Sequence, residues 1–128
     1  MKFQTFNILK KLEIKIDEGT PIVIFQGYKA INKRGIEKLI DELYANLPAD
    51  VKEARKYLSE KNIDIKQNSS DNLYENIKNF EINLEKGLHI AKYVIVNIHQ
   101  LENLIDRIYE SIPNEITTVK DIEKLDNM

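Results

Sequence analysis

Apolar residues recur every three or four positions in two long segments of the chain, residues 36–47 and 101–112. This spacing places them on one face of an α-helix and leaves charged residues on the other face. The apolar positions are Ile36, Leu39, Ile40, Leu43, Tyr44 and Leu47 in the first segment, and Leu101, Leu104, Ile105, Ile108, Tyr109 and Ile112 in the second. We therefore predict two amphipathic helices that bury these faces.

The residues around each segment indicate where its helix begins and ends. Asn32 and Asn97 stand just before the first apolar positions, where an amide oxygen can accept a hydrogen bond from the free N–H groups of the first turn. Pro48 and Pro113 follow the last apolar positions, and proline clashes with a preceding helical turn. We predict that each helix ends at its proline and that a short further helix follows.

Two segments rich in β-branched and aromatic residues, 20–31 and 88–96, predict strands. In the first, Gln26-Gly27 separates the runs IVIF and YKAI, which is the spacing of a tight hairpin. In the second, the hairpin tip shrinks to Ala91-Lys92, which is less favourable turn chemistry. A single strand is therefore the alternative there.

The segments that open each half of the chain fit two patterns. LEIKID and FEINLE alternate as a strand would, whereas the surrounding apolar residues have helical spacing. Those residues are Leu9, Leu12 and Ile16, and Leu73, Ile77, Phe80 and Leu84. We favour helices, because the helical pattern covers more residues, and Gly19 and Gly87 are suited to end them.

The two halves resemble each other in sequence. Residues 31–51 align without a gap on residues 96–116, at an offset of 65, and seven positions are identical. The identical pairs are Asn32/Asn97, Glu37/Glu102, Leu39/Leu104, Ile40/Ile105, Asp41/Asp106, Tyr44/Tyr109 and Pro48/Pro113. Upstream, residues 12–19 match 80–87. The chain thus reads as two copies of one unit, 1–65 and 66–128, with a polar joint near 59–72.

These elements predict a mainly helical α+β protein, a tandem duplication of an α-β(β)-α-α unit. A unit of this length buries little apolar surface alone, and a lone hairpin leaves unpaired edges. We expect the two copies to share one core around a pseudo-twofold axis, in a single domain.

Composition and charge narrow the class of protein. The chain is 42% hydrophobic and 31% charged, has no cysteine and carries a formal charge of −2. The absent cysteines exclude disulfides and thiolate chemistry, and no apolar run is long enough for a membrane span. The mixed charges argue against nucleic-acid binding. We expect a cytoplasmic protein.

Catalytic and cofactor motifs are missing from the sequence. The four glycines form no phosphate-binding loop, and the two histidines have no partners at metal-ligand spacing. We predict no enzyme activity, no metal and no cofactor. The alternative is a small-ligand binder or unrecognised enzyme that uses a cleft between the copies. Its polar groups would be four carboxylates at equivalent positions, Glu37, Asp41, Glu102 and Asp106.

Residues 19–58 carry a loose but ordered pattern. It runs from Pro21 and an apolar segment through Gly27-Tyr28-Lys29 to a Leu/Ile helix that ends in Leu47-Pro48. A helix rich in Ala, Arg, Lys and Glu follows. The pattern resembles a short module at the start of some bacterial coiled-coil proteins, variously labelled DivIVA-like or ATP-synthase-b-like. The resemblance implies an assembly or interaction module without catalytic residues. Those proteins continue into a long coiled coil, whereas this chain repeats the module.

Aromatic residues of the predicted strands are the candidate binding residues. Phe25, Tyr28 and Tyr93 lie near strand ends or edges, and exposed aromatics there contribute much of the energy of a protein contact. The alternative is that the three rings fill the shared core. The leading hypothesis is a protein-interaction module that docks a protein partner or forms a homo-oligomer.

Overall fold

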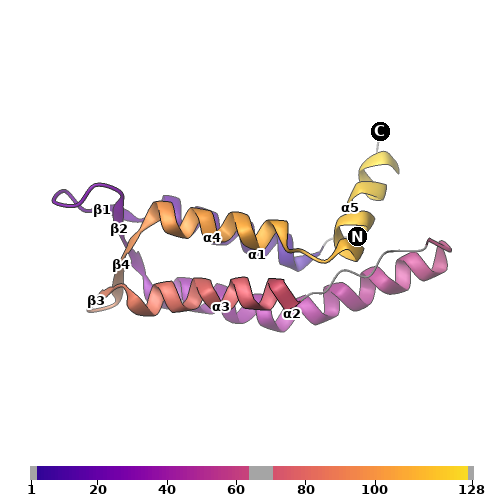
Figure 1. Cartoon of the computed structure of the whole chain (residues 1–128), viewed down its shortest axis with the longest axis horizontal. Helices are drawn as coiled ribbons and strands as arrows, with labels where there is room; N and C mark the ends of the chain where they lie inside the picture. The colour runs from indigo at the N-terminus through magenta and orange to yellow at the C-terminus, as the bar shows by residue number, and fades with distance from the viewer. Residues whose placement is uncertain (1–2, 64–70, 127–128) are drawn as a thin grey trace.

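A computed structural model describes residues 3–63 and 71–126 of the chain. These residues form five helices and a four-stranded antiparallel sheet (Figure 1). In chain order the elements are α1 (Gln4–Asp17), β1 (Thr20–Pro21), β2 (Tyr28–Asn32), α2 (Lys33–Glu60), α3 (Asp71–Lys86), β3 (Leu88–Ile90), β4 (Tyr93–Asn97), α4 (Ile98–Glu110) and α5 (Asn114–Asp126). The predicted α+β, mainly helical class is confirmed.

Four of the helices form a bundle that leads away from the sheet. α1 packs against α2, α3 packs against α4, and α1 also contacts α4. The rings of Tyr44 in α2 and Tyr74 in α3 stack with their centroids 6.2 Å apart, so these two helices are neighbours as well. Figure 1 shows the sheet at one end of this bundle, and α5 with the C-terminal part of α2 at the other end.

The bundle encloses one apolar core. Buried side chains from all five helices and from the two central strands form a single cluster. The apolar positions predicted in 36–47 and 101–112 belong to this cluster, apart from Tyr44 and Tyr109, which lie half-buried at its edge. The two amphipathic helices are therefore confirmed. α5 adds Ile116 and Val119, which have no exposed surface.

The two asparagines cap their helices as predicted. The Asn32 side-chain oxygen accepts a hydrogen bond from the Gly35 N–H at 3.2 Å, and the Asn97 oxygen accepts one from the Gln100 N–H at 3.3 Å. Each bond satisfies one of the N–H groups that the first turn leaves free.

Both opening segments are helices, α1 and α3, so the strand alternative is wrong. Gly19 and Gly87 follow them, but neither has the left-handed backbone of a glycine cap; among the described glycines that conformation occurs at Gly27, with φ 82°. At Gly19 and Gly87 the sheet approaches the backbone closely instead. A Cβ at Gly19 would lie 3.1 Å from Ile31 Cγ1.

The sheet joins the two halves of the chain. Its strand order is β1-β2-β4-β3, and each pair is antiparallel. The central strands β2 and β4 pair over five residues, with Ala30 opposite Ile95 at the middle. Because β1 and β3 are short, the outer edges of the sheet offer few hydrogen-bonding groups.

The first hairpin is present, but its strand and tip differ from the prediction. β1 consists of Thr20 and Pro21, and residues 22–27 form a loop rather than continuing the strand. The tight turn predicted at Gln26-Gly27 is therefore wrong. The loop closes with hydrogen bonds from Ile22 N–H to the Tyr28 carbonyl, 3.0 Å, and from Tyr28 N–H to the Phe25 carbonyl, 3.3 Å. If residues 22–25 continued the strand, their apolar side chains would alternate between the two faces of the sheet. The helices cover only one of these faces, so a strand would not bury all four side chains.

The second hairpin keeps the tip at Ala91-Lys92, so the single-strand alternative is wrong. Ala91 adopts φ 53°, in the left-handed region that a two-residue hairpin turn requires. This conformation is costly for alanine. The pairing of β3 with β4 on both sides of the turn holds it in place.

Pro48 does not end a helix. α2 runs continuously from Lys33 to Glu60 with Pro48 inside it, whereas α4 ends at Glu110 and α5 begins after Pro113 as predicted. Proline removes one backbone hydrogen bond, but the residues beyond it are held by tertiary packing. Ala54 and Leu58 are fully buried, and α5 packs along this part of α2.

The predicted joint near 59–72 is partly helical. α2 extends to Glu60, and α3 begins at Asp71. Residues 64–70, which include the boundary between the predicted copies, lie outside the described residues.

Candidate functional site

The sheet has one covered and one open face. Ile31, Val94 and Val96 are buried against the helices. Because side chains alternate along a strand and paired residues share a face, the neighbouring positions point away from the bundle. These outward positions are Thr20, Tyr28, Ala30, Asn32, Leu88, Ile90, Tyr93, Ile95 and Asn97. None of them carries a charge.

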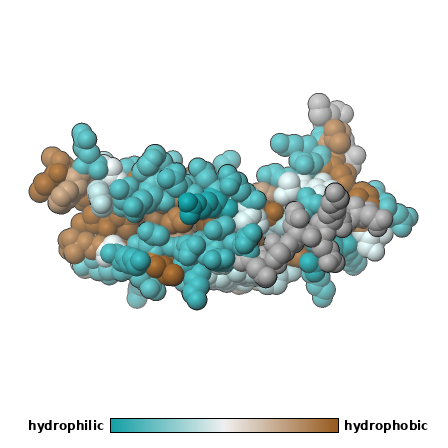
Figure 2. Space-filling view, in the orientation of Figure 1, coloured by the Kyte–Doolittle hydropathy of each residue, from teal (hydrophilic) through white to brown (hydrophobic). Residues whose placement is uncertain are grey.

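Large apolar side chains concentrate at this end of the molecule. The exposed ones are Val23, Ile24 and Phe25 of the β1–β2 loop together with Tyr28, Leu88, Ile90 and Tyr93 of the strands. We call these seven residues the sheet-end patch. Val23 is 99% exposed and Ile24 is 84% exposed. Figure 2 shows hydrophobic atoms gathered at the end where Figure 1 shows the sheet, and the loop extends away from the bundle.

The three candidate binding aromatics lie within the sheet-end patch. Phe25 is 60% exposed, Tyr28 38% and Tyr93 40%, so the alternative that these rings fill the core is wrong. The rings of Phe25 and Tyr28 are in contact, with centroids 6.0 Å apart. The Lys92 ammonium lies over the ring of Tyr93, with its Nζ 5.7 Å from the ring centroid.

Sequence reasoning missed the aliphatic residues of the patch. The pattern of residues 20–31 predicts a strand for Val23 and Ile24, and alternation along a strand buries only one of the two. Leu88 and Ile90 have the period of two that puts both on one face. The sequence therefore predicts that Leu88 and Ile90 share a face of the sheet, but it does not indicate which face the helices cover.

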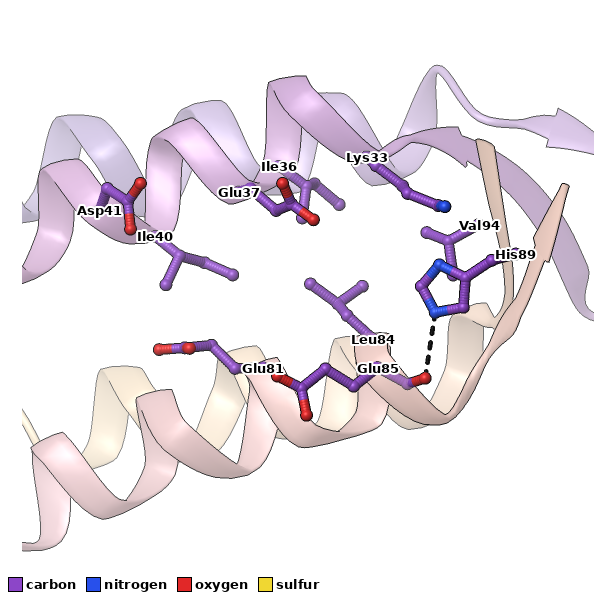
Figure 3. A pocket seen from close by; sticks show the side chains of 10 residues that line it. All are labelled: Lys33, Ile36, Glu37, Ile40, Asp41, Glu81, Leu84, Glu85, His89 and Val94. Atoms are coloured by element: carbon purple, nitrogen blue, oxygen red, sulfur yellow. Dashed lines mark hydrogen bonds between the residues drawn. The ribbon is translucent and has the colours of Figure 1, made fainter. Parts of the chain in front are cut away.

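Glu37 and Asp41 line an acidic groove between α2 and α3. Its volume is about 250 Å³, and α3 contributes Glu81 and Glu85. Figure 3 shows these carboxylates around the space between the two helices, with Lys33 and His89 near the sheet. The His89 Nε2 lies 3.0 Å from the Glu85 carbonyl oxygen, a backbone contact that orients the ring.

Glu102 and Asp106 line a second groove, between α1 and α4. Its volume is about 270 Å³, and Glu13 and Asp17 complete its acidic lining. The idea that the four candidate carboxylates meet in one cleft is therefore wrong, because α2 and α4 lie on a diagonal of the bundle. All four are exposed. Within residues 3–63 and 71–126, no cluster of three or more His, Asp or Glu side chains has an arrangement that could hold a metal ion.

A tyrosine contacts one carboxylate of each groove. The Tyr44 hydroxyl donates a hydrogen bond to Glu81, and the Tyr109 hydroxyl donates one to Glu13. Burial, followed by the adjacent carboxylate, raises the pKa of Tyr44 well above its ordinary value. The same causes raise the pKa of Tyr109 to about 12. The two rings thus pack against the core and tie neighbouring helices together, as a half-buried tyrosine often does.

We expect the stability of the protein to fall as the pH rises from about 10 toward 12. The unfolded chain releases these phenolic protons near pKa 10.0, whereas folded Tyr109 holds its proton to about 12. The folded state therefore binds more protons in this window, and the free energy of unfolding decreases through it. Absorbance titration of phenolate would check this, with Tyr44→Phe and Tyr109→Phe each removing a late-titrating group. A high-pH titration unchanged in Tyr109→Phe would contradict it.

Two buried carboxylates outside the predicted sites hold the far end of the bundle. Asp50 accepts hydrogen bonds from the Thr5 backbone N–H at 2.7 Å and from the Thr5 hydroxyl at 2.6 Å. Glu115 is 3% exposed and pairs with the Arg55 Nε at 3.5 Å. Asp50 and Glu115 are equivalent in the alignment of the two halves, and each follows a proline by two residues. This shared position is the feature of the sequence that could have identified them.

No helix of the described residues is both long and apolar enough to cross a bilayer. No family model, curated protein or solved structure matches the chain.

Proposed function

We propose that this chain is a non-catalytic protein-interaction or assembly module that binds through the sheet-end patch. The observation that carries the proposal is the concentration of exposed apolar side chains at one end of the molecule, where none of the outward strand positions carries a charge. Soluble monomers rarely expose a contiguous apolar patch of more than a few hundred Å². Aromatic and aliphatic side chains on such a surface are typical of the centre of a protein interface.

The scaffold behind the patch is suited to this role. The strands rest on buried Ile31, Val94 and Val96. The four strand residues of the patch are therefore displayed on a packed base, and its other three residues lie on the β1–β2 loop beside it. A preformed surface binds without the entropic cost of ordering itself. The resemblance of residues 19–58 to an assembly module favours the same function.

The same proposal includes a tandem duplication, with copies 1–65 and 66–128. The order α-β-β-α occurs twice, and residues 65 apart, Ala30 and Ile95, pair at the centre of the sheet. The two acidic grooves are also lined by equivalent residues, such as Glu37 and Glu102. A pseudo-twofold axis through the sheet accounts for all three observations.

The alternative of a ligand site with paired carboxylates has less support. Glu37 and Asp41 lie in one groove and Glu102 and Asp106 in another. Exposed carboxylates on helix surfaces are ordinary solvated residues. We therefore place the function at the sheet end rather than in the grooves.

The proposal predicts that charge on the patch abolishes binding. A tagged chain would be compared with the double variant Phe25→Glu/Leu88→Glu and with Leu125→Glu, because Leu125 is 70% exposed at the opposite end of the molecule. Light scattering over about a hundredfold range of concentration would detect self-association, and cross-linking in the producing cells would detect other partners. We expect the wild type and Leu125→Glu to bind and the double variant to lose binding.

One result would refute the proposal. It is a wild-type chain that stays monomeric over the whole range and cross-links to the same proteins, in the same amounts, as the double variant. Circular dichroism must show equal helix content in all three proteins.

A further inference from the structure

We propose that the partner of the sheet-end patch is the same patch on a second copy of this chain. The product is a twofold dimer in which two four-stranded sheets stack face to face. This inference rests on the proposed function and names the partner that the surface fits.

The extent of the patch matches what a stable dimer needs. The exposed fractions of its seven side chains range from 38% at Tyr28 to 99% at Val23. An aromatic side chain buries roughly 150–250 Å² when fully covered, and the four aliphatic side chains of the patch are smaller. Complete covering of the patch would therefore bury on the order of 800 Å², which is about what each partner contributes to a standard interface.

The geometry favours contact between faces over contact between edges. β1 is two residues long, and one of them is Pro21, which has no N–H to donate. β3 at the other edge has three residues, Leu88–Ile90. A strand added at either edge would gain few hydrogen bonds and leave the apolar face in water. Two stacked faces cover it on both copies, as in a β-sandwich.

The distribution of charge favours a second copy over a lipid surface. The outward positions of the four strands are uncharged, so two copies can meet without repulsion between like charges. The charged residues that flank the strands along the chain carry both signs. The basic ones are Lys29, Lys33, Arg34, Lys86 and Lys92, and the acidic residues Asp17, Glu18 and Glu85 alternate with them. A surface that inserts into anionic lipid normally has a rim dominated by Lys and Arg.

The unequal hairpins determine how the two sheets are placed. The β1–β2 loop spans residues 22–27 and extends away from the bundle, whereas the β3–β4 turn is only Ala91 and Lys92 (Figure 1). The two hairpin tips lie at opposite ends of the strands, because Tyr28 pairs with Asn97 and Tyr93 pairs with Asn32. A twofold axis parallel to the strands stacks β1 over β3 and places each loop at the end of β3 where Leu88 lies. In this arrangement Ile24 of each copy lies nearest Leu88 of the other.

The first test is the oligomeric state of the purified full chain. Light scattering and sedimentation over about a hundredfold range of concentration should give twice the mass of the 15.0 kDa chain. Ile90→Glu, which changes a residue that is 52% exposed on the outer face, should weaken the dimer at least tenfold. Leu125→Glu introduces the same charge at the far end and should leave the dimer unchanged.

The second test addresses the arrangement of the sheets. Ile24→Lys and Leu88→Glu, the latter at a residue that is 61% exposed, should each be monomeric alone. Mixed in equal amounts they should form a heterodimer, visible by native mass spectrometry, because the new lysine of one copy lies against the new glutamate of the other. A mixture that stays monomeric would overturn the stacking of β1 over β3.

The outcomes separate this inference from the proposed function. A wild-type monomer, or a dimer that Ile90→Glu does not weaken, overturns the inference. If that monomer cross-links to another protein and Phe25→Glu/Leu88→Glu removes the cross-link, the proposed function stands without the dimer. If the monomer instead binds vesicles of anionic phospholipid through the patch and cross-links to no protein, both proposals fail.

Discussion

Asp50→Ala is expected to lower the free energy of unfolding by about 3 kcal/mol, because it removes two hydrogen bonds to a charged acceptor. The Asp50 carboxylate accepts from the Thr5 N–H at 2.7 Å and from the Thr5 hydroxyl at 2.6 Å. Thr5 is 1% exposed, so water cannot replace the lost acceptor. The N–H belongs to the first turn of α1, which has no acceptor within its own helix. Urea denaturation followed by circular dichroism would measure the loss.

Three further variants isolate the cause. Asp41→Ala makes the same change at an exposed position of the same helix and should alter stability by less than about 0.5 kcal/mol. Asp50→Asn keeps an acceptor of similar shape and should cost about half as much as Asp50→Ala. A double-mutant cycle with Thr5→Val should show coupling of at least about 0.5 kcal/mol. Equal small losses for Asp41→Ala and Asp50→Ala would disprove that the Asp50 carboxylate stabilises the start of α1.

Gly87→Ala is expected to destabilise the protein by about 2 kcal/mol through overpacking. A Cβ at this position would lie 2.8 Å from Val94 Cγ2 and 2.9 Å from the Ile95 carbonyl oxygen. Val94 is buried, and the carbonyl belongs to the paired central strand β4. Moving either group would therefore disturb core packing or strand pairing. Thermal and urea denaturation would measure the effect.

Gly35→Ala is the matched control for this substitution. A Cβ there would have Lys15 Cε as its nearest neighbour, at an ordinary 3.5 Å. Since alanine favours helix over glycine, the variant should gain about 0.5–1 kcal/mol. If Gly87→Ala is as stable as the wild type, the close approach of α3 to the sheet does not limit this position.

Local chemistry was enough to predict several elements. The three- and four-residue spacing of apolar side chains located α1, the first part of α2, α3, α4 and α5, because burial of one helix face needs only that periodicity. The caps at Asn32 and Asn97 were predictable for the same reason, since an N-cap bond spans only three residues. The turn at Ala91-Lys92 followed from counting residues between two strands.

The errors arose where distant contacts outweigh local preference. Pro48 reads as a helix end, yet α2 continues through it, because Ala54 and Leu58 beyond the proline are buried and α2 contacts α5. The run IVIF reads as a strand, yet β1 pairs only at Thr20 and Pro21. The candidate carboxylates repeat in sequence, yet the diagonal placement of α2 and α4 puts them in separate grooves.

Periodicity and composition alone predicted an α+β chain with an amphipathic helix in each half and aromatics near its strands. The exposure of those aromatics depended on the tertiary structure, because a strand has two faces and only the packed helices decide which one is covered. The buried role of Asp50 likewise required knowing that α2 passes the start of α1, 45 residues away along the chain. The sequence pattern indicates which side chains are apolar, whereas the tertiary packing determines which of them are buried.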